Sequence, residues 1–296
     1  MLTGILKWES GTRKRAVGYN KQMSRYLFRP PAVFLVLFFC MLPARGYALD
    51  GREKNIIAAG LRAQADGMSA GQRIAFFAER FVGVPYDTNP LGLYVVRKAI
   101  VADDRVDCMY LVFRSVELAL SSTPEGAGNL ALLMRFKTVG RLGPDGKVLN
   151  YEDRYRYGLD MILSGKWGRN ITASLGRPEL VATTRRFQEM GVDNVLVLPR
   201  GEIEGALPRF KSGDIVFFVK DPARRAAQEV IGHMGIILET GDGKVYLIHA
   251  HGSKKTSGSP AGTSRGYEET GEVVKIPFAD YVKKMPFIGI MVTRFD

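Results

Sequence analysis

Cysteine, histidine and tryptophan are scarce in this chain: its 296 residues include two cysteines, three histidines and two tryptophans. Two cysteines are too few for a small disulfide-stabilised scaffold. The sequence has no internal repeat, and its 46% hydrophobic and 24% charged residues are typical of a globular protein rather than a disordered or collagen-like one. The length predicts one large domain or two small ones with a substantial hydrophobic core.

The formal net charge of +12 is typical of proteins that bind nucleic acid or an anionic membrane. Most of this charge lies in the first 48 residues, where eight lysines and arginines are opposed only by Glu9. This leader therefore carries seven of the twelve net charges, and the other five are spread over the rest of the chain. So diffuse a charge does not indicate a nucleic-acid partner.

An apolar block, Ala32–Leu42, follows the basic segment, and a small-x-small ending reaches Ala48. This pattern is typical of a secretory signal. The block is shorter than the about 20 apolar residues that a membrane-spanning helix needs. We therefore predict a signal peptide over residues 1–48, with Met23 as an alternative start, and a single exported domain over residues 49–296. An uncleaved leader that anchors the protein to the membrane is the alternative interpretation.

Helical patterns come first in the mature chain and strands come later. Apolar residues recur at three- and four-residue spacing in three predicted helices, over residues 55–65, 69–82 and 108–120. Predicted strands cover residues 214–219, 231–238, 245–250, 272–277 and 289–294, and a Thr-Gly-Asp-Gly turn joins the second and third into a hairpin. Residues 129–210 show no pattern that we can trace. Helices followed by antiparallel strands predict the α+β class.

Removal of the leader would leave Cys108 as the only cysteine. This residue follows Asp107, a favoured N-cap residue, at the start of a predicted helix. The free N–H groups and the dipole of a first helical turn stabilise a thiolate. Cys108 is therefore a candidate nucleophile. The alternative is a small buried apolar side chain, a common environment for an unpaired cysteine.

All three histidines, His233, His249 and His251, lie within nineteen residues on the predicted hairpin. A nucleophilic thiol needs a base on a rigid element and a third polar group that orients the base. His249 and His251 share one face of their strand because side chains alternate. His233 joins that face if the turn is a three-residue Gly241–Gly243 loop, whereas a two-residue loop would place it on the other face.

The three histidines also fit two other interpretations. They could ligate a hydrolytic zinc ion as three protein ligands with an open fourth position. That interpretation leaves Cys108 unexplained, and no carboxylate pattern of a zinc hydrolase accompanies the histidines. Alternatively, the three histidines lie on an exposed hairpin by chance and have no common function. The pairing of a thiol with imidazoles accounts for more of the unusual residues, and it requires no metal and no organic cofactor.

Five motifs follow one another in this chain: Phe81-Val-Gly-Val-Pro-Tyr86, Asp107-Cys108, Lys211-Ser-Gly-Asp-Ile-Val216, Gly232-His-Met-Gly-Ile236 and Leu247-Ile-His-Ala250. In this order they resemble the NlpC-type cell-wall cysteine peptidases of bacteria. The C-terminal motifs Phe278-Ala-Asp-Tyr-Val282 and Gly289-Ile-Met-Val-Thr-Arg294 are similar to the N-acetylmuramoyl-L-alanine amidase-like subfamily. The resemblance covers roughly residues 74–296. It implies a papain-like fold, with N-terminal helices packed on a C-terminal antiparallel sheet.

The resemblance also implies a role for each matching residue. Cys108 corresponds to the nucleophile, His233 to the general base and His249 to the polar residue that orients the base. Tyr86 would donate a hydrogen bond to the substrate or the oxyanion. Asp107 resembles an acidic position near the amine of the substrate, in addition to its capping role.

The chain departs from the family pattern in two places. Met109 and Tyr110 stand where the family usually has small or hydroxyl residues. Residues 154–170, where the subfamily has a recognition loop with a histidine, contain none here and offer Trp167 as a substrate contact. The order of the motifs also leaves open whether His249 or His251 orients the base.

The resemblance implies an exported cysteine hydrolase of the bacterial periplasm or cell envelope. Its substrate would be an amide bond in peptidoglycan or muropeptides, either the muramoyl–L-alanine amide or an amide of the stem peptide. A catalytically inactive cell-wall-binding module and a papain-like acyltransferase are the alternatives on the same fold. Peptidoglycan is the expected partner, and the membrane would be one only through an uncleaved leader.

Export with cleavage predicts that the mature protein begins at Leu49, because the small residue Ala48 ends the signal. N-terminal sequencing of the protein recovered from the cell envelope checks this start. Retention of Met1 or Met23 on the exported protein would contradict cleavage and favour the anchored alternative.

Overall fold

The computed structural model describes residues 51–225, 228–252 and 271–296, which belong to one unit of the chain, Gly46–Asp296. The predicted signal peptide lies outside these residues and stays a prediction. Among the helices within these ranges, none has both the length and the apolar character that crossing a membrane requires.

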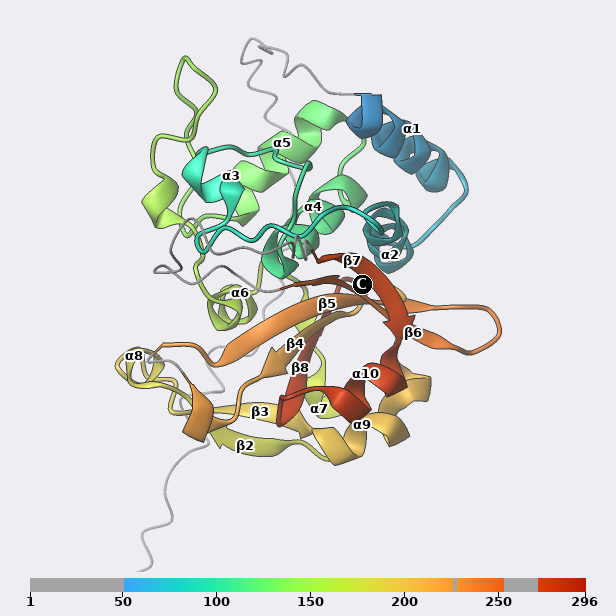
Figure 1. Ribbon diagram of the computed structural model, residues 1–296, viewed down its shortest axis with the longest axis vertical. Helices are drawn as coiled ribbons and strands as arrows, with labels where there is room; N and C mark the ends of the chain where they lie inside the picture. The colour runs from blue at the N-terminus through green and yellow to red at the C-terminus, as the bar shows by residue number, and fades with distance from the viewer. Residues whose placement is uncertain (1–50, 226–227, 253–270) are drawn as a thin grey trace, which may run out of the picture. The chain divides into compact units, whose positions relative to one another are not determined.

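An antiparallel sheet of eight strands runs through the described unit (Figure 1). Seven strands follow in the order β2-β3-β8-β4-β5-β6-β7, and β1 pairs with β8 beside this path. The C-terminal strand β8 lies inside the sheet, where it pairs with β3 on one side and with β4 on the other. It therefore links the strands from the middle of the chain to β4 and the hairpin strands β5 and β6. The strands are β1 (Arg169–Asn170), β2 (Glu179–Ala182), β3 (Asn194–Pro199), β4 (Ile215–Val219), β5 (Ile231–Glu239), β6 (Val245–His251), β7 (Glu272–Pro277) and β8 (Gly289–Arg294).

Helices cover both faces of this sheet. In Figure 1, α2, α4 and α5 lie on one side of the strands, and α7, α9 and α10 lie on the other. The helices are α1 (Gly51–Ala65), α2 (Ala70–Arg80), α3 (Leu93–Val96), α4 (Cys108–Ala119), α5 (Pro124–Met134), α6 (Gly158–Ser164), α7 (Thr172–Leu175), α8 (Arg185–Gln188), α9 (Arg200–Ala206) and α10 (Phe278–Lys284). Three 3-10 turns, Tyr151–Asp153, Leu207–Arg209 and Pro222–Arg224, complete the connections.

Two hydrophobic cores follow from the alternation of side chains along the strands. Ile236 of β5 and Ile248 of β6 point into the core that contains α2 and α4. Their neighbours Ile237 and Leu247 point into the other core, which contains α9 and α10. Each hairpin strand is therefore buried on both faces, which explains its nearly continuous apolar sequence.

The predicted α+β class is confirmed, and most predicted elements match observed ones. Ser69 caps α2 in a reciprocal capping box with Gln72, and the strands of the hairpin lie within one residue of their predicted bounds. The untraced segment, residues 129–210, contains α6 to α9 and the strands β1 to β3. These elements are only two to seven residues long, too short to display a period.

Helix α4 is buried so completely that its charged side chains need partners inside the protein. Arg114 binds Asp103 with its Nε atom 2.9 Å from Oδ1. Glu117 accepts two hydrogen bonds of 2.6 Å from Arg135, which follows α5. Tyr110 donates to Asp103 at 2.7 Å. These bonds fix α4 to the loop before it and to α5, and so fix the helix start that carries Cys108.

We expect Glu117→Gln to destabilise the fold by about 3 kcal/mol, because breaking a buried ion pair leaves Arg135 without its counter-charge. Urea denaturation gives the free energy of unfolding. Asp104→Asn is the matched control, since Asp104 pairs with Arg97 at 2.9 Å but both side chains are about half exposed; its cost should stay below about 1 kcal/mol. Equal effects of the two substitutions would contradict this role of Glu117.

Candidate active site

Cys108 occupies the first position of α4, as the sequence predicts. Asp107 is the N-cap residue, and its Oδ1 atom accepts a hydrogen bond from the backbone N–H of Tyr110 at 2.8 Å. The Cys108 side chain is partly buried, and every following residue from Tyr110 to Ala119 is buried. The thiol therefore lies at the positive end of the helix dipole. Because the helix is buried, water screens this dipole only weakly.

Tyr86 lies beside the start of α4. Its segment forms a parallel bridge with Val106, two residues before Cys108, and the N–H of Asp87 donates to the Val106 carbonyl at 3.0 Å. Gly252, just after β6, packs so closely on the Tyr86 ring that an added Cβ would lie 2.3 Å from its Cγ atom. These contacts hold the phenol near the thiol. Burial raises the pKa of Tyr86, and the negative charges of Cys108, Asp107 and Asp87 raise it further. The phenol therefore stays protonated and can donate.

His233 and His249 form a direct hydrogen bond, with 2.9 Å between His233 Nε2 and His249 Nδ1. The hairpin register explains why they meet. Glu239 pairs with Val245, and the N–H of Thr240 donates to the carbonyl of Lys244 at 2.9 Å, so the strands are joined by a three-residue turn, Gly241–Gly243. This is the turn that the sequence predicted, and its register places both imidazoles on one face. His251 is exposed at the end of β6, so His249 is the partner of His233.

Two glycines of β5 make room for the imidazole pair. A β-bulge in the pairing of β4 with β5 lies next to His233, where Phe218 pairs with His233 but Val219 pairs with Ile231. The skipped residue is Gly232, and an added Cβ there would lie 2.8 Å from the Phe287 ring. A Cβ on Gly235 would lie 3.1 Å from the Cβ of His249. Bulges often redirect a side chain next to a functional site.

Aromatic rings enclose the His233 imidazole. The Phe218 ring stacks on it with centroids 5.6 Å apart, and the Phe287 ring is nearly parallel to it at 6.4 Å. Tyr281 of α10 lies 6.2 Å from His233 and 4.9 Å from His249. The rings restrict the orientation of the imidazole, and His233 is partly buried.

Burial lowers the pKa of both His233 and His249, and repulsion from neighbouring imidazoles lowers these pKa values further. Both rings are therefore neutral at neutral pH, the form in which an imidazole accepts a proton. The His233–His249 bond uses one nitrogen of each ring. Among the described residues, the Nε2 atom of His249 is buried without a hydrogen-bond partner.

Tyr281 connects the thiol with the imidazole pair. The charge of Cys108 adds to burial in raising the pKa of Tyr281, so the two side chains lie within electrostatic range, while the Tyr281 ring contacts His249. Helix α4 packs against β5 and β6, the strands that carry the two histidines. Side-chain contacts thus join His233, His249 and Tyr281, and Cys108 lies within electrostatic range of Tyr281 and of Tyr86. Tyr281 was not among the predicted site residues, because its position within the short motif Phe278–Val282 was its only signal in the sequence.

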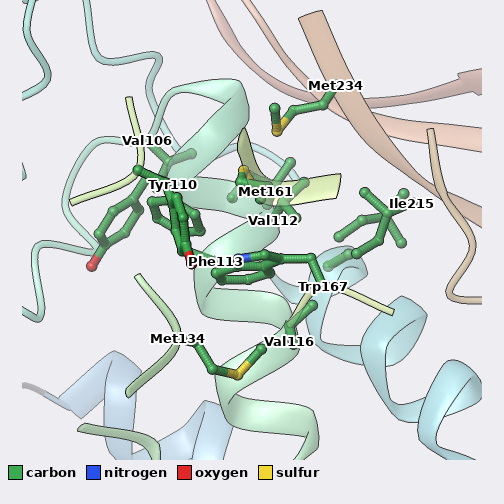
Figure 2. Close-up of a cluster of buried hydrophobic side chains, with 14 of the residues drawn as sticks. Val106, Tyr110, Val112, Phe113, Val116, Met134, Met161, Trp167, Ile215 and Met234 are labelled. Atoms are coloured by element: carbon green, nitrogen blue, oxygen red, sulfur yellow. The ribbon is translucent and has the colours of Figure 1, made fainter. Parts of the chain in front are cut away.

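Trp167 lies away from this group. Its ring is completely buried against Phe113, with centroids 4.8 Å apart, and Figure 2 shows it among core side chains such as Val116 and Ile215. The predicted substrate contact therefore has no surface to offer in this structure, and the size of the ring serves core packing. Asp107 is also buried, and its capping bond to Tyr110 is the role that the structure displays.

The geometry of the histidines disfavours the zinc interpretation. Within the described ranges, no group of three or more His, Cys, Asp or Glu side chains is arranged to hold a metal ion. His233 and His249 direct two of their nitrogen atoms at each other rather than at a common point. A shared proton fits this arrangement, whereas a shared ion does not.

The lowered pKa values predict an acid-sensitive fold. Since both imidazoles bind protons more readily in the unfolded chain, the free energy of unfolding should fall as pH drops below about 6.5. Each ring contributes at most about 1.4 kcal/mol per pH unit. Between pH 6.5 and pH 5, the free energy of unfolding should fall by about 2 kcal/mol less in His233→Gln than in the wild-type protein. Urea denaturation at the two pH values measures this difference. His251→Gln removes an exposed imidazole and should keep the wild-type loss; identical losses in both variants would contradict the prediction.

Comparisons with known proteins show the fold but not a family. No protein-family model matches the sequence, and no curated protein is significantly similar to it. The structure resembles an N-acetylmuramoyl-L-alanine amidase from Bacteroides uniformis, with a TM-score of 0.56 and 20% identity over 76% of this chain and 98% of that chain. It also resembles a DUF1460 protein from Legionella pneumophila, with a TM-score of 0.56 and 16% identity over 81% of this chain and 92% of that chain. The chain therefore shares an α+β fold with amidase-like and DUF1460 proteins.

Proposed function

We propose that this protein is an exported cysteine hydrolase that cleaves an amide bond in bacterial peptidoglycan or muropeptides. The observation that carries the proposal is the hydrogen-bonded pair of neutral imidazoles, His233 and His249, in the same region as a thiol at a capped helix start. A nucleophile, a base and a residue that orients the base are the three parts that acyl transfer through a thiol requires.

The His233–His249 bond defines which nitrogen acts as the base. If His233 carries its proton on Nε2 and donates it to His249 Nδ1, the lone pair on His233 Nδ1 is left for the thiol proton. His249 then carries its own proton on Nε2. The stacked rings of Phe218 and Phe287 keep the His233 imidazole in this orientation.

In the first half of the reaction, Sγ of Cys108 attacks the amide carbonyl carbon while His233 Nδ1 takes the thiol proton. The carbon–nitrogen bond then breaks, and the imidazolium returns that proton to the leaving amine, which leaves a thioester on Cys108. In the second half, His233 removes a proton from water as the water attacks the thioester. Collapse releases a carboxylic acid and restores the thiol.

The negative charge on the carbonyl oxygen needs donors that are already in position. We assign one donor to the backbone N–H of Cys108, because the N–H groups of a first helical turn point toward the end of the helix, where an anion is stabilised. The Tyr86 phenol is the second, since its segment is held beside Val106 and its raised pKa keeps it protonated. No metal or organic cofactor takes part in this mechanism.

The choice of substrate is supported by the sequence motifs of the NlpC type, which imply a papain-like fold, and by the shared fold with the Bacteroides uniformis amidase. The basic leader and the apolar block at residues 32–42 support export to the cell envelope, where peptidoglycan lies. The mature chain has a modest positive net charge, which suits an anionic cell-wall polymer.

We expect Cys108→Ala to lower muropeptide turnover at least about a thousandfold, because the nucleophile is lost while the fold is kept. The assay incubates the mature protein with purified peptidoglycan fragments and identifies the products by mass spectrometry. His251→Gln is the control, since it removes an imidazole outside the His233–His249 bond and should keep most of the activity.

Three outcomes of this assay would contradict the proposal. Full turnover by Cys108→Ala would exclude the thiol mechanism. Binding of fragments by the wild-type protein without any turnover would identify a cell-wall-binding module. Products that incorporate an added amine acceptor in preference to water would identify an acyltransferase.

A further inference from the structure

Tyr281 lies at the point where the elements of the candidate site meet. Helix α10 follows β7 directly and packs against β6 and β7. From this helix the Tyr281 ring contacts His249 at 4.9 Å and Phe218 at 5.0 Å between centroids, and it lies 6.2 Å from His233. Among the tyrosines that the structure describes, Tyr281 is therefore the one whose ring lies against both imidazoles of the hydrogen-bonded pair.

The hydroxyl of Tyr281 lies in the electrostatic field of the thiol. Burial and the charge of Cys108 both raise the pKa of Tyr281, so the phenol stays protonated over the physiological range. A protonated phenol has a positive hydrogen end that stabilises a neighbouring anion, whereas an ionised one would repel it. The ring and the hydroxyl can therefore act separately, the ring on the imidazoles and the hydroxyl on the sulfur.

We propose that Tyr281 is a positioning residue of this centre: its ring keeps His233 and His249 in their hydrogen-bonded arrangement, and its hydroxyl stabilises the thiolate of Cys108. The inference rests on the proposed function in that it takes Cys108 as the nucleophile. The contacts of one ring with both imidazoles give it a geometric basis that is independent of the substrate.

Several other titratable groups interact with Tyr86 or with the imidazoles and must stay unchanged in the test. Those that face the site come from four elements: Tyr86 and Asp87 from the segment after α2, Asp107 from the cap of α4, His233 from β5, and His249 and His251 from β6. A substitution at Tyr281 leaves all of them in place, so a change in thiol reactivity reports on Tyr281 itself.

The experiment measures the rate of alkylation of Cys108 by iodoacetamide between pH 4 and pH 10, with intact-protein mass as the readout. The midpoint of this profile gives the pKa of the thiol. Tyr281→Phe removes only the hydroxyl, and we expect it to raise the midpoint by about one pH unit, so that the rate on the acid side falls about tenfold. The rate at high pH should be unchanged, because the sulfur is then fully ionised in both proteins.

Tyr281→Leu removes the ring as well, and we expect a further loss in which the rate of muropeptide turnover falls more than the apparent affinity. Tyr246→Phe is the matched control: this tyrosine is on β6, its ring lies under Lys275, and it should keep the wild-type profile. If Tyr281→Leu fails to fold, as judged by circular dichroism, Tyr281→Phe alone decides the question.

An alkylation profile of Tyr281→Phe that matches the wild-type profile would overturn the role of the hydroxyl. The alkylation assay needs no substrate, so it separates this inference from the proposed function. A shifted profile together with an absence of muropeptide turnover by the wild-type protein would support the positioning role and contradict the hydrolase. Turnover by the wild-type protein together with unshifted alkylation profiles in both Tyr281 variants would support the hydrolase and contradict the positioning role.

Discussion

The hydrogen bond between His233 and His249 is the interaction on which the rest of the candidate site depends. It joins two imidazoles that burial keeps neutral, so it has to be a bond between one donor and one acceptor nitrogen. The odd-numbered hairpin loop puts both rings on one face, and the bulge at Gly232 directs His233 into its aromatic surroundings. A slip of one residue in the register would separate the rings.

The thiol depends on a different constraint, the burial of α4. A helix this deeply enclosed cannot leave Arg114 and Glu117 unpaired, and their bonds to Asp103 and Arg135 fix its position between the sheet and α5. The N-cap at Asp107 then sets where the helix begins. Core packing and a few buried ion pairs thereby determine the position of the partly buried Cys108 thiol.

Much of this arrangement could be predicted from the sequence because local rules determine it. The capped start at Cys108 and the hairpin of the histidines depend on residues close in the chain, and the structure contains both. The role of Trp167 could not be predicted locally, since a large aromatic ring serves a core or a substrate equally well and only tertiary packing decides. Tyr281 was missed for a similar reason: it lies 32 positions after His249 in the chain, and only the fold brings α10 against the imidazoles. The strands between residues 129 and 210, β1 to β3, are short, and they are stabilised by pairing within the sheet rather than by a local sequence pattern.

The location of the protons on the two imidazoles is the most direct test of this account. Nitrogen-15 NMR of labelled histidines distinguishes the two neutral tautomers of each ring. At neutral pH the account predicts a proton on Nε2 of His233 and on Nε2 of His249, with His233 Nδ1 free to accept the thiol proton. A neutral His233 with its only proton on Nδ1, accepting a bond from Nδ1 of His249, would contradict the account, because that ring could not act as the base.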